Sequence, residues 1–214
     1  MNNHMKTIYA FLVMLISLQA SAQSFEGTIR WSAKSNPPDA RGMTGLTIKA
    51  KGNNLITVVN GGMMNGAEMW YLNRDTKVMR VMRPQKMFAV MPPEALAAAA
   101  QASSASRFVQ TNETAKVLSY TVRKFTGEIK MGMATSKVTF WTTTDLKDDQ
   151  HVLARQPDPF GYPKLPEGVT GVPLKIEIVA ANGTTTILEV VEVKSEKLGD
   201  DTFAVPADFK EMGK

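Results

Sequence analysis

The chain has 214 residues, with 25 Lys and Arg against 20 Asp and Glu, which gives a formal net charge of +5. It contains no cysteine, and this excludes disulfide bonds, thiolate catalysis and thiolate metal ligands. The basic residues are interleaved with acidic ones and form no dense block, so we interpret the charge as a solvated surface and expect no nucleic-acid partner.

The first 22 residues have the pattern of a secretory signal peptide. Lys6 supplies the positive charge, residues 7–18 form an apolar run, and Ala20-Ser21-Ala22 is a small-residue cleavage signal. The alternative is an uncleaved N-terminal anchor, but the apolar run is too short to cross a bilayer comfortably. We therefore expect cleavage, one mature domain over residues 23–214, and a periplasmic or secreted protein that is not membrane-integral.

Most of the mature chain has the pattern of β-strands. Residues 25–33 alternate apolar and polar side chains, as a strand with one wet face does. The turn sequences Gly52-Asn53-Asn54 and Asn182-Gly183 each lie between two such segments and predict β-hairpins. Residues 55–59 are apolar on both faces, which indicates a strand that is covered on two sides. Further strands are expected at residues 69–72, 77–83, 87–90, 117–125, 127–131 and 138–142.

Residues 93–107 differ from the rest. Pro93 and Glu94 suit the first turn of a helix, and residues 96–102 are nearly all alanine, the strongest helix former. The sequence predicts one small-faced helix here; a flexible Ala/Ser-rich linker is the alternative. We expect a mainly β (α+β) fold in which a curved antiparallel sheet forms an incomplete β-barrel and the Ala-rich helix lies on its concave side.

The order of several segments resembles that of a family of exported bacterial proteins of unassigned function, a domain of unknown function related to the outer-membrane lipoprotein carriers LolA and LolB. The resemblance implies a half-barrel closed by helix, with an apolar cleft that shields acyl chains in the carriers. The carriers have several helices over this cleft, whereas this sequence predicts one. The segments that carry the resemblance are FEGTIRW, IKAKGNN–LITVVN, MWYLNRDTKVMRVM, KVTFWTTTDL, GVPLKIEI and LEVVEVKSEKLGDDTFAVPADFK.

The sequence offers few parts for catalysis. After cleavage His151 is the only histidine, and its neighbours Asp148 and Asp149 lie beside it on a charged loop, where they do not form an oriented catalytic base. There is no Gly-x-Ser-x-Gly elbow and no phosphate-binding loop. We expect no enzyme activity, no catalytic residues, no cofactor and no metal site.

The methionine content, 14 residues, is the unusual feature of the composition. Methionine side chains either fill irregular core space or line an adaptable apolar cleft. From the concave sheet and the resemblance to the carriers, we expect a non-catalytic envelope protein that binds a lipid, an acylated molecule or another apolar ligand in the concave cleft. A structural module that binds an envelope protein partner, without a small ligand, is one alternative. Copper handling through the soft thioether ligands is another. The residues expected to line the cleft, because they flank the Ala-rich segment, are Met82, Met87, Phe88, Met91 and Leu96.

Overall fold

A computed structural model describes residues 24–39, 41–73, 77–95, 103–131, 133–148, 152–155 and 165–213 of the chain. The expected signal peptide, residues 1–22, and most of the Ala-rich segment, residues 96–102, lie outside this part. No helix in the described part combines the length and apolarity that crossing a bilayer requires.

The described residues form thirteen strands and three short 3-10 helices. The strands are β1 (Gly27–Asn36), β2 (Gly45–Lys51), β3 (Asn54–Asn60), β4 (Ala67–Leu72), β5 (Lys77–Met82), β6 (Met87–Val90), β7 (Ser103–Ala105), β8 (Val109–Val117), β9 (Tyr120–Met131), β10 (Ala134–Thr143), β11 (Val172–Val179), β12 (Thr185–Ser195) and β13 (Lys210–Glu211). The 3-10 helices are η1 (Arg83–Gln85), η2 (Leu153–Arg155) and η3 (Asp200–Phe203).

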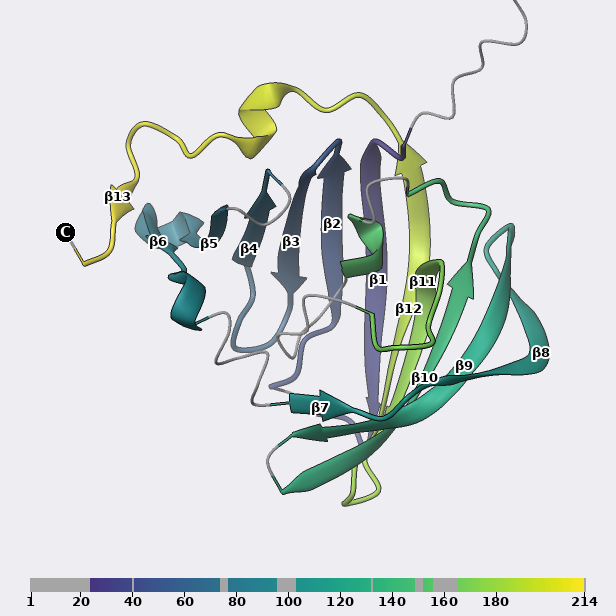
Figure 1. Cartoon of the computed structure of the whole chain (residues 1–214). Coiled ribbons are helices and arrows are strands. Elements are labelled where there is room, and N and C mark those ends of the chain that lie inside the picture. Colours follow the sequence, from purple (N-terminus) through teal and green to yellow (C-terminus); the bar gives the residue numbers. More distant parts are fainter. Residues whose placement is uncertain are drawn as a thin grey trace, which may run out of the picture.

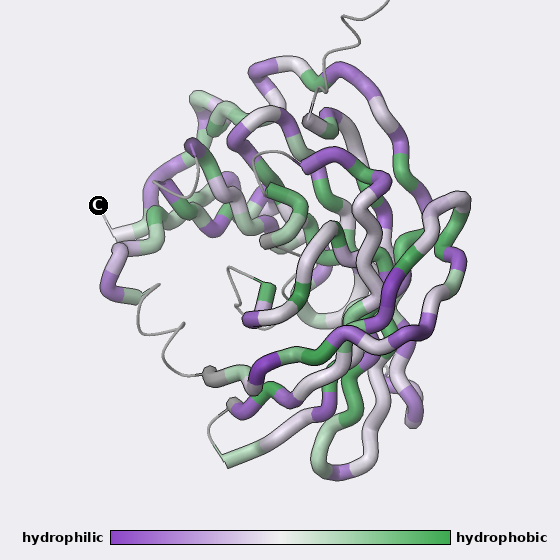
Figure 2. The backbone as a smooth tube through the Cα atoms, turned by 45° about the vertical axis from the view of Figure 1, so that its right-hand side comes forward, coloured by the Kyte–Doolittle hydropathy of each residue, from purple (hydrophilic) through white to green (hydrophobic). Residues whose placement is uncertain are grey.

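All of these strands belong to one open, curved sheet (Figure 1). Its order is β13-β6-β5-β4-β3-β2-β1-β12-β11-β10-β9-β7, and β8 pairs with β9 beside β7. Neighbouring strands are antiparallel except β13, which lies parallel to β6 and makes the sheet mixed. Hydrophobic and hydrophilic stretches alternate along the backbone (Figure 2), as the period of two in the sequence predicts. The expected β-rich, curved architecture is thus confirmed.

Both predicted hairpins are present, since β2 pairs with β3 and β11 with β12 across the expected turns. The expected strand at residues 117–125 is wrong in its boundaries. The chain reverses at Leu118 and Ser119, so β8 ends at Val117 and β9 runs unbroken from Tyr120 to Met131. Leu118 adopts a positive φ of 53°, a conformation that usually calls for glycine or asparagine, so the sequence contained no turn signal there.

The expected helix over residues 93–107 is only partly consistent with the structure. Residues 93–95 are helical, and the amide of Ala95 donates to the carbonyl of Pro92 at 3.0 Å. Residues 103–105, however, form β7 and pair with Ile129–Met131 of β9. The helix therefore ends before Ser103, because hydrogen bonds to a distant strand override the local preference of an Ala/Ser-rich segment. A helix on the concave side is not confirmed.

The main core lies on the face of the sheet that carries Ile29 and Trp31, which we call the inner face; the opposite one is the outer face. Over β9–β12 the inner face is filled by the long connection between β10 and β11 and by Phe108. From that connection, Leu146, Val152, Leu153 and Val169 are all buried. Among the described residues, these loops fill this half of the curved sheet.

Gly127 on β9 makes room for the Phe108 ring. A Cβ at this glycine would lie 2.6 Å from the ring, well inside van der Waals contact. The Phe108 ring packs edge-on against Phe140 of β10, with 5.3 Å between the centroids. The amide of Phe108 donates to the carbonyl of Glu167 at 2.8 Å, which ties the two connections together.

A second core lies on the outer face of β3–β6. It consists of buried side chains from three strands, and the C-terminal segment after β12 packs three half-buried side chains over them. This segment, residues 196–213, is called the strap. It crosses the outer face from β12 to β6, where β13 ends it (Figure 1). The core residues are Ile56, Trp70, Leu72, Met79 and Val81, and those of the strap are Phe203, Val205 and Phe209.

The expectation that residues 55–59 are covered on both faces is confirmed, with the strap as the second cover. Leu55 and Val59 contact the inner core, whereas Ile56 and Val58 contact the outer one.

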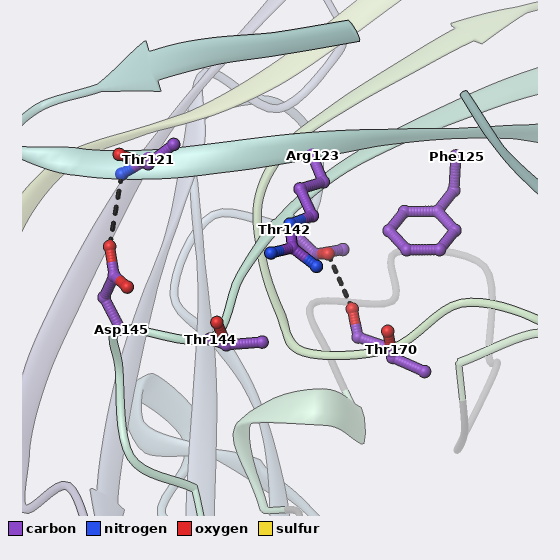
Figure 3. Close-up of a pocket in the computed structure, with 7 residues that line it drawn as sticks. All are labelled: Thr121, Arg123, Phe125, Thr142, Thr144, Asp145 and Thr170. Carbon is purple, nitrogen blue, oxygen red and sulfur yellow. Dashed lines mark hydrogen bonds between the residues drawn. The ribbon is translucent and has the colours of Figure 1, made fainter. Parts of the chain in front are cut away.

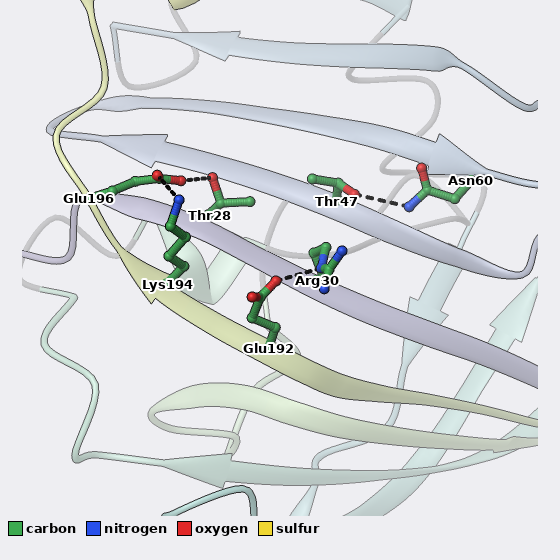
Figure 4. Close-up of polar contacts among 7 residues, drawn as sticks. All are labelled: Thr28, Arg30, Thr47, Asn60, Glu192, Lys194 and Glu196. Atoms are coloured by element: carbon green, nitrogen blue, oxygen red, sulfur yellow. Dashed lines mark hydrogen bonds and ion pairs between the residues drawn. The ribbon is translucent and has the colours of Figure 1, made fainter.

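Over β1, β2 and β12 the outer face is polar, and several of its charges are paired (Figure 4). Arg30 bonds to Glu192 at 2.6 Å, and Glu196 accepts a hydrogen bond from the hydroxyl of Thr28 at 2.8 Å. This part of the sheet faces water on one side, whereas the part covered by the strap does not.

Candidate ligand-binding site on the inner face

The pairing register places the inner-face side chains of β1–β6 in rows that run across the strands. One row passes from Trp31 through Leu46, Val59 and Ala67 to Met82 and Met87. Strands spaced about 4.8 Å apart make its outer part, from Val59 to Met87, about 14 Å long. This is close to half the roughly 30 Å hydrocarbon core of a bilayer, which is the depth of one lipid leaflet.

Burial changes along this row. Trp31 and Leu46 are 4% and 1% exposed, whereas Val59, Ala67, Met82 and Met87 are half-buried. In the next row Ile29 and Ile48 are buried, and Thr57, Met69 and Ala89 are half-buried. In these two rows the inner face is therefore a closed core under β1 and β2 and a partly accessible, largely apolar surface over β3–β6. In the third row Leu55 of β3 and Val78 of β5 are buried.

Three of the five residues expected to line a cleft share this surface. Met82 pairs directly with Met87, and Met91 lies on the same face because it is four positions beyond Met87 along an extended chain. The amide of Met91 donates to the carbonyl of Val78 at 2.8 Å and holds the chain there. Phe88 lies on the opposite face and packs in the outer core, so it does not belong with the others. Leu96 lies outside the described residues.

The structure adds residues that the sequence analysis did not place in the site. Met69 of β4 lies on the same face as Met82. Four half-buried methionines, Met69, Met82, Met87 and Met91, therefore share the inner face of β4, β5, β6 and the position just after β6. Arg80 lies between Met69 and Ala89 in the second row and is exposed. The alternation within residues 67–72 and 77–82 indicates which side chains of one strand share a face. It does not indicate which face of the next strand they join, because that depends on the register across the intervening turn.

Trp31, at the inner end of the first row, contributes a polar atom to the apolar core. Its indole Nε1 is buried and has no hydrogen-bond partner in the described part of the chain. A buried donor without an acceptor is costly, by about 1–3 kcal/mol. A ligand oxygen or a water molecule that reached Trp31 would relieve this cost.

A separate small pocket lies at one end of the inner face, between β9, β10 and the two ends of the β10–β11 connection (Figure 3). Its volume is about 70 Å³, and Phe125 and Thr142 form its buried part. The Thr142 hydroxyl donates to the carbonyl of Thr170 at 2.6 Å, and the amide of Thr121 donates to Asp145 at 3.3 Å. Small-molecule sites usually measure several hundred Å³, so this polar pocket has room for a compact group and not for an acyl chain.

The charged loop around His151, considered above for catalysis, has a structural role where it is described. The carboxylate of Asp148 accepts hydrogen bonds from the amides of Val152 and Ala154, at 2.7 and 2.8 Å. These bonds hold the start of η2 against the inner core. Asp149 and His151 themselves lie outside the described residues.

The chain belongs to a family defined by a domain of unknown function, DUF4412, whose model matches residues 18–209. This confirms the resemblance to a family of unassigned function that the sequence indicated. No curated protein matches the chain.

Two solved structures are similar in fold. PNGF-II matches with a TM-score of 0.51 and 16% identity, over 86% of this chain and 31% of that one, so this chain spans about a third of its length. The lipoprotein LppX of Mycobacterium tuberculosis matches with a TM-score of 0.39 and 10% identity, over 80% of this chain and 90% of that one. At such identities the likeness to PNGF-II concerns the fold alone.

Proposed function

We propose that this protein is an exported, non-catalytic binding protein that holds a lipid, an acylated molecule or another apolar ligand against the inner face of β3–β6. The observation that carries the proposal is the position of the second core. The strap stabilises β3–β6 on the outer face, and most of their inner face, apart from the buried Leu55 and Val78, is a half-buried apolar surface. Export is inferred from the signal-peptide pattern of residues 1–22.

The binding energy would come from the transfer of apolar surface out of water. At about 25 cal/mol per Å², burial of roughly 300 Å² contributes about 7 kcal/mol before the cost of association. Methionine suits such a surface, since its unbranched side chain repacks around ligands of different shape. The absence of cysteine, and a single histidine after residue 22, support a role without covalent or acid-base chemistry.

The test combines mass spectrometry of natively purified protein with displacement of the neutral fluorescent probe N-phenyl-1-naphthylamine. We expect a co-purified lipid, or saturable displacement of the probe by long-chain alcohols and acids. Met82→Gln, which keeps the shape but removes apolar surface, should weaken binding by about three- to tenfold. Met63→Gln is the matched control because Met63 is 83% exposed in the loop before β4. If the protein binds neither lipid nor probe, or both variants behave alike, the proposal is wrong.

A second function, a structural or interaction module without a small ligand, is favoured by the other half of the sheet. The β10–β11 connection and Phe108 already fill the inner face over β9–β12. If mass spectrometry detects no co-purified lipid and the fluorescent probe does not bind, this function is favoured.

Copper handling remains the third alternative. The four methionines on one face offer soft thioether ligands, and Met82 faces Met87 directly across the β5–β6 pair. Titration with Cu(I) under reducing conditions separates this alternative from the others, since Met82→Leu and Met87→Leu would abolish metal binding and preserve lipid binding.

A further inference from the structure

Arg80 differs in its surroundings from the other cations of the sheet. The inner-face methionines Met69, Met82, Met87 and Met91 form what we call the methionine surface. Arg80 lies at its centre on β5, with Met69 of β4 on one side and Ala89 of β6 on the other. Among the inner-face residues described on β3–β6 it is the only charged one. Arg80 is exposed, so water solvates its charge in the free protein, but an apolar ligand that covered it would have to supply a partner of opposite sign.

Three other cations around β3–β6 and the strap have such partners, whereas Lys77, which is exposed on the outer face of β5, has none in the described part of the chain. Lys51 bonds to Asp200 at 2.8 Å, Lys86 bonds to Asp208 at 2.8 Å, and Arg83 bonds to Glu68. Arg80 makes no ion pair with any residue in the described part of the chain. Its guanidinium group, with five donors in a fixed fork, is suited to two parallel hydrogen bonds with a carboxylate or a phosphate.

We propose that the ligand of the inner face is an anionic amphiphile. Its carboxylate or phosphate group pairs with Arg80, and its hydrocarbon part lies along the row from Val59 to Met87. This inference rests on the proposed function and specifies its ligand class. The apolar contacts come from Met69, which lies beside Arg80 in the same row, and from Met82 and Met87 in the neighbouring row. The cation beside it supplies the selection, because an uncharged lipid of equal length makes the apolar contacts and lacks the ion pair.

The test compares ligands that differ only in charge. The protein from residue 23 onward is titrated with dodecanoate, methyl dodecanoate and dodecanol at pH 8 and constant ionic strength, with the neutral probe as reporter. We expect dodecanoate to bind about tenfold or more tightly than its methyl ester, as hydrogen bonds to a charged group imply. Arg80→Gln should remove this preference and leave binding of the ester and the alcohol unchanged, whereas Arg80→Lys should keep part of it.

Arg123→Gln is the matched control, because Arg123 is also exposed on the inner face but lies on β9, in the small polar pocket. It should leave all three affinities unchanged. A second arm titrates short-chain phosphatidic acid and compares its affinity, and its loss in Arg80→Gln, with those of dodecanoate; this separates a phospholipid headgroup from a free fatty acid.

The outcomes are distinct. Equal binding of acid and ester by the unmodified protein, or a loss in Arg80→Gln that is the same for both, overturns the ion pair while the apolar site stands. Failure of every ligand to displace the probe overturns the proposed function itself. Thermal melts of each variant confirm that an exposed arginine has been replaced without unfolding the sheet.

Discussion

The two halves of this sheet place their cores on opposite faces. Over β9–β12 the core is on the inner face, where the β10–β11 connection and Phe108 fill the bend of the sheet. Over β3–β6 a separate core of buried side chains lies on the outer face, under the strap. The inner face is consequently closed in one half and half-buried in the other.

This difference separates stability from binding. Ligand sites, like cores, are lined mainly by apolar side chains. Here β4 sends Trp70 into the outer core and Met69 and Tyr71 to the inner face, so alternate residues of one strand serve the two purposes. The half-buried side chains on the inner face of β4–β6 should therefore tolerate substitution with little effect on the fold, whereas Leu55 and Val78 are buried on the same face.

The largest expected effect is the loss of the outer core. Trp70 is fully buried, and its indole donates to Glu68 at 2.6 Å, so Trp70→Ala removes a large side chain and leaves a buried carboxylate with one donor fewer. We expect a loss of about 3–5 kcal/mol in the free energy of unfolding, measured by urea denaturation. Met82→Ala, on the half-buried inner face of the neighbouring strand, should cost about 1 kcal/mol or less.

The comparison that tests the difference between the two halves is the ratio of the losses in unfolding free energy caused by Trp70→Ala and Met82→Ala. If Met82→Ala destabilises the protein as much as Trp70→Ala, the inner face of β3–β6 is a core and the distinction between the halves fails. Met79→Ala serves as a second outer-face variant without a hydrogen bond to lose, since Met79 is fully buried in the same cluster.

A smaller effect is expected in the other half, at the contact between Gly127 and Phe108. Gly127→Ala places a methyl group 2.6 Å from the Phe108 ring, which is fixed between β9 and the β10–β11 connection. Overpacking of this kind costs about 1–3 kcal/mol, read from the urea midpoint. Ligand binding on β3–β6 should not change.

The double variant checks the cause. In the double variant Gly127→Ala/Phe108→Ala, the added methyl group has no ring to contact. The stability losses of the two single variants should therefore sum to more than the loss measured for the double variant. Strict additivity would mean that the glycine is required for another reason.

Much of the fold could be predicted from local sequence. The hairpin at Asn182-Gly183 and the apolar faces of residues 55–59 follow from turn chemistry and from a period of two, both of which act over a few residues. Strand β8 could not be predicted in this way. Most of its side chains between Gln110 and Lys116 are polar and exposed, so no alternation marks it as a strand. The turn that joins it to β9 is formed by Leu118 and Ser119.

The candidate site was predictable only in part, because it depends on register. The sequence indicated Met82, Met87 and Met91, which the structure brings onto one face, but it grouped Phe88 with them although neighbouring residues of a strand point to opposite sides. Met69 and Arg80 join the site through pairing across β4 and β5. The strap that makes the outer face a core comes from the far end of the chain, and no local pattern reveals such a contact.

The smallest expected effect concerns the two ion pairs that hold the strap. The hydrogen bond from Lys51 lowers the pKa of the Asp200 carboxyl below its ordinary 3.8, and Lys86 does the same to the pKa of Asp208. A carboxyl group with a lowered pKa in the folded protein stabilises it above its ordinary pKa, and this contribution is lost as the pH falls through the lowered value. The pKa values of Lys51 and Lys86 are raised above 10.5 by the same bonds, so their contribution is lost as the pH rises past that value.

Protection of the strap should therefore be greatest at intermediate pH and decline below about pH 4, before the sheet unfolds. Amide hydrogen exchange measures this at Lys210 and Met212, whose N–H groups donate to the carbonyls of Lys86 and Phe88 at 2.9 and 2.8 Å. Protection factors corrected for the intrinsic pH dependence should fall there and stay constant in the β11–β12 hairpin. Asp208→Asn should remove the Lys86 share of the acid response, so an unchanged acid response in this variant would mean that the apolar contacts of Phe203, Val205 and Phe209 hold the strap without help from the charges.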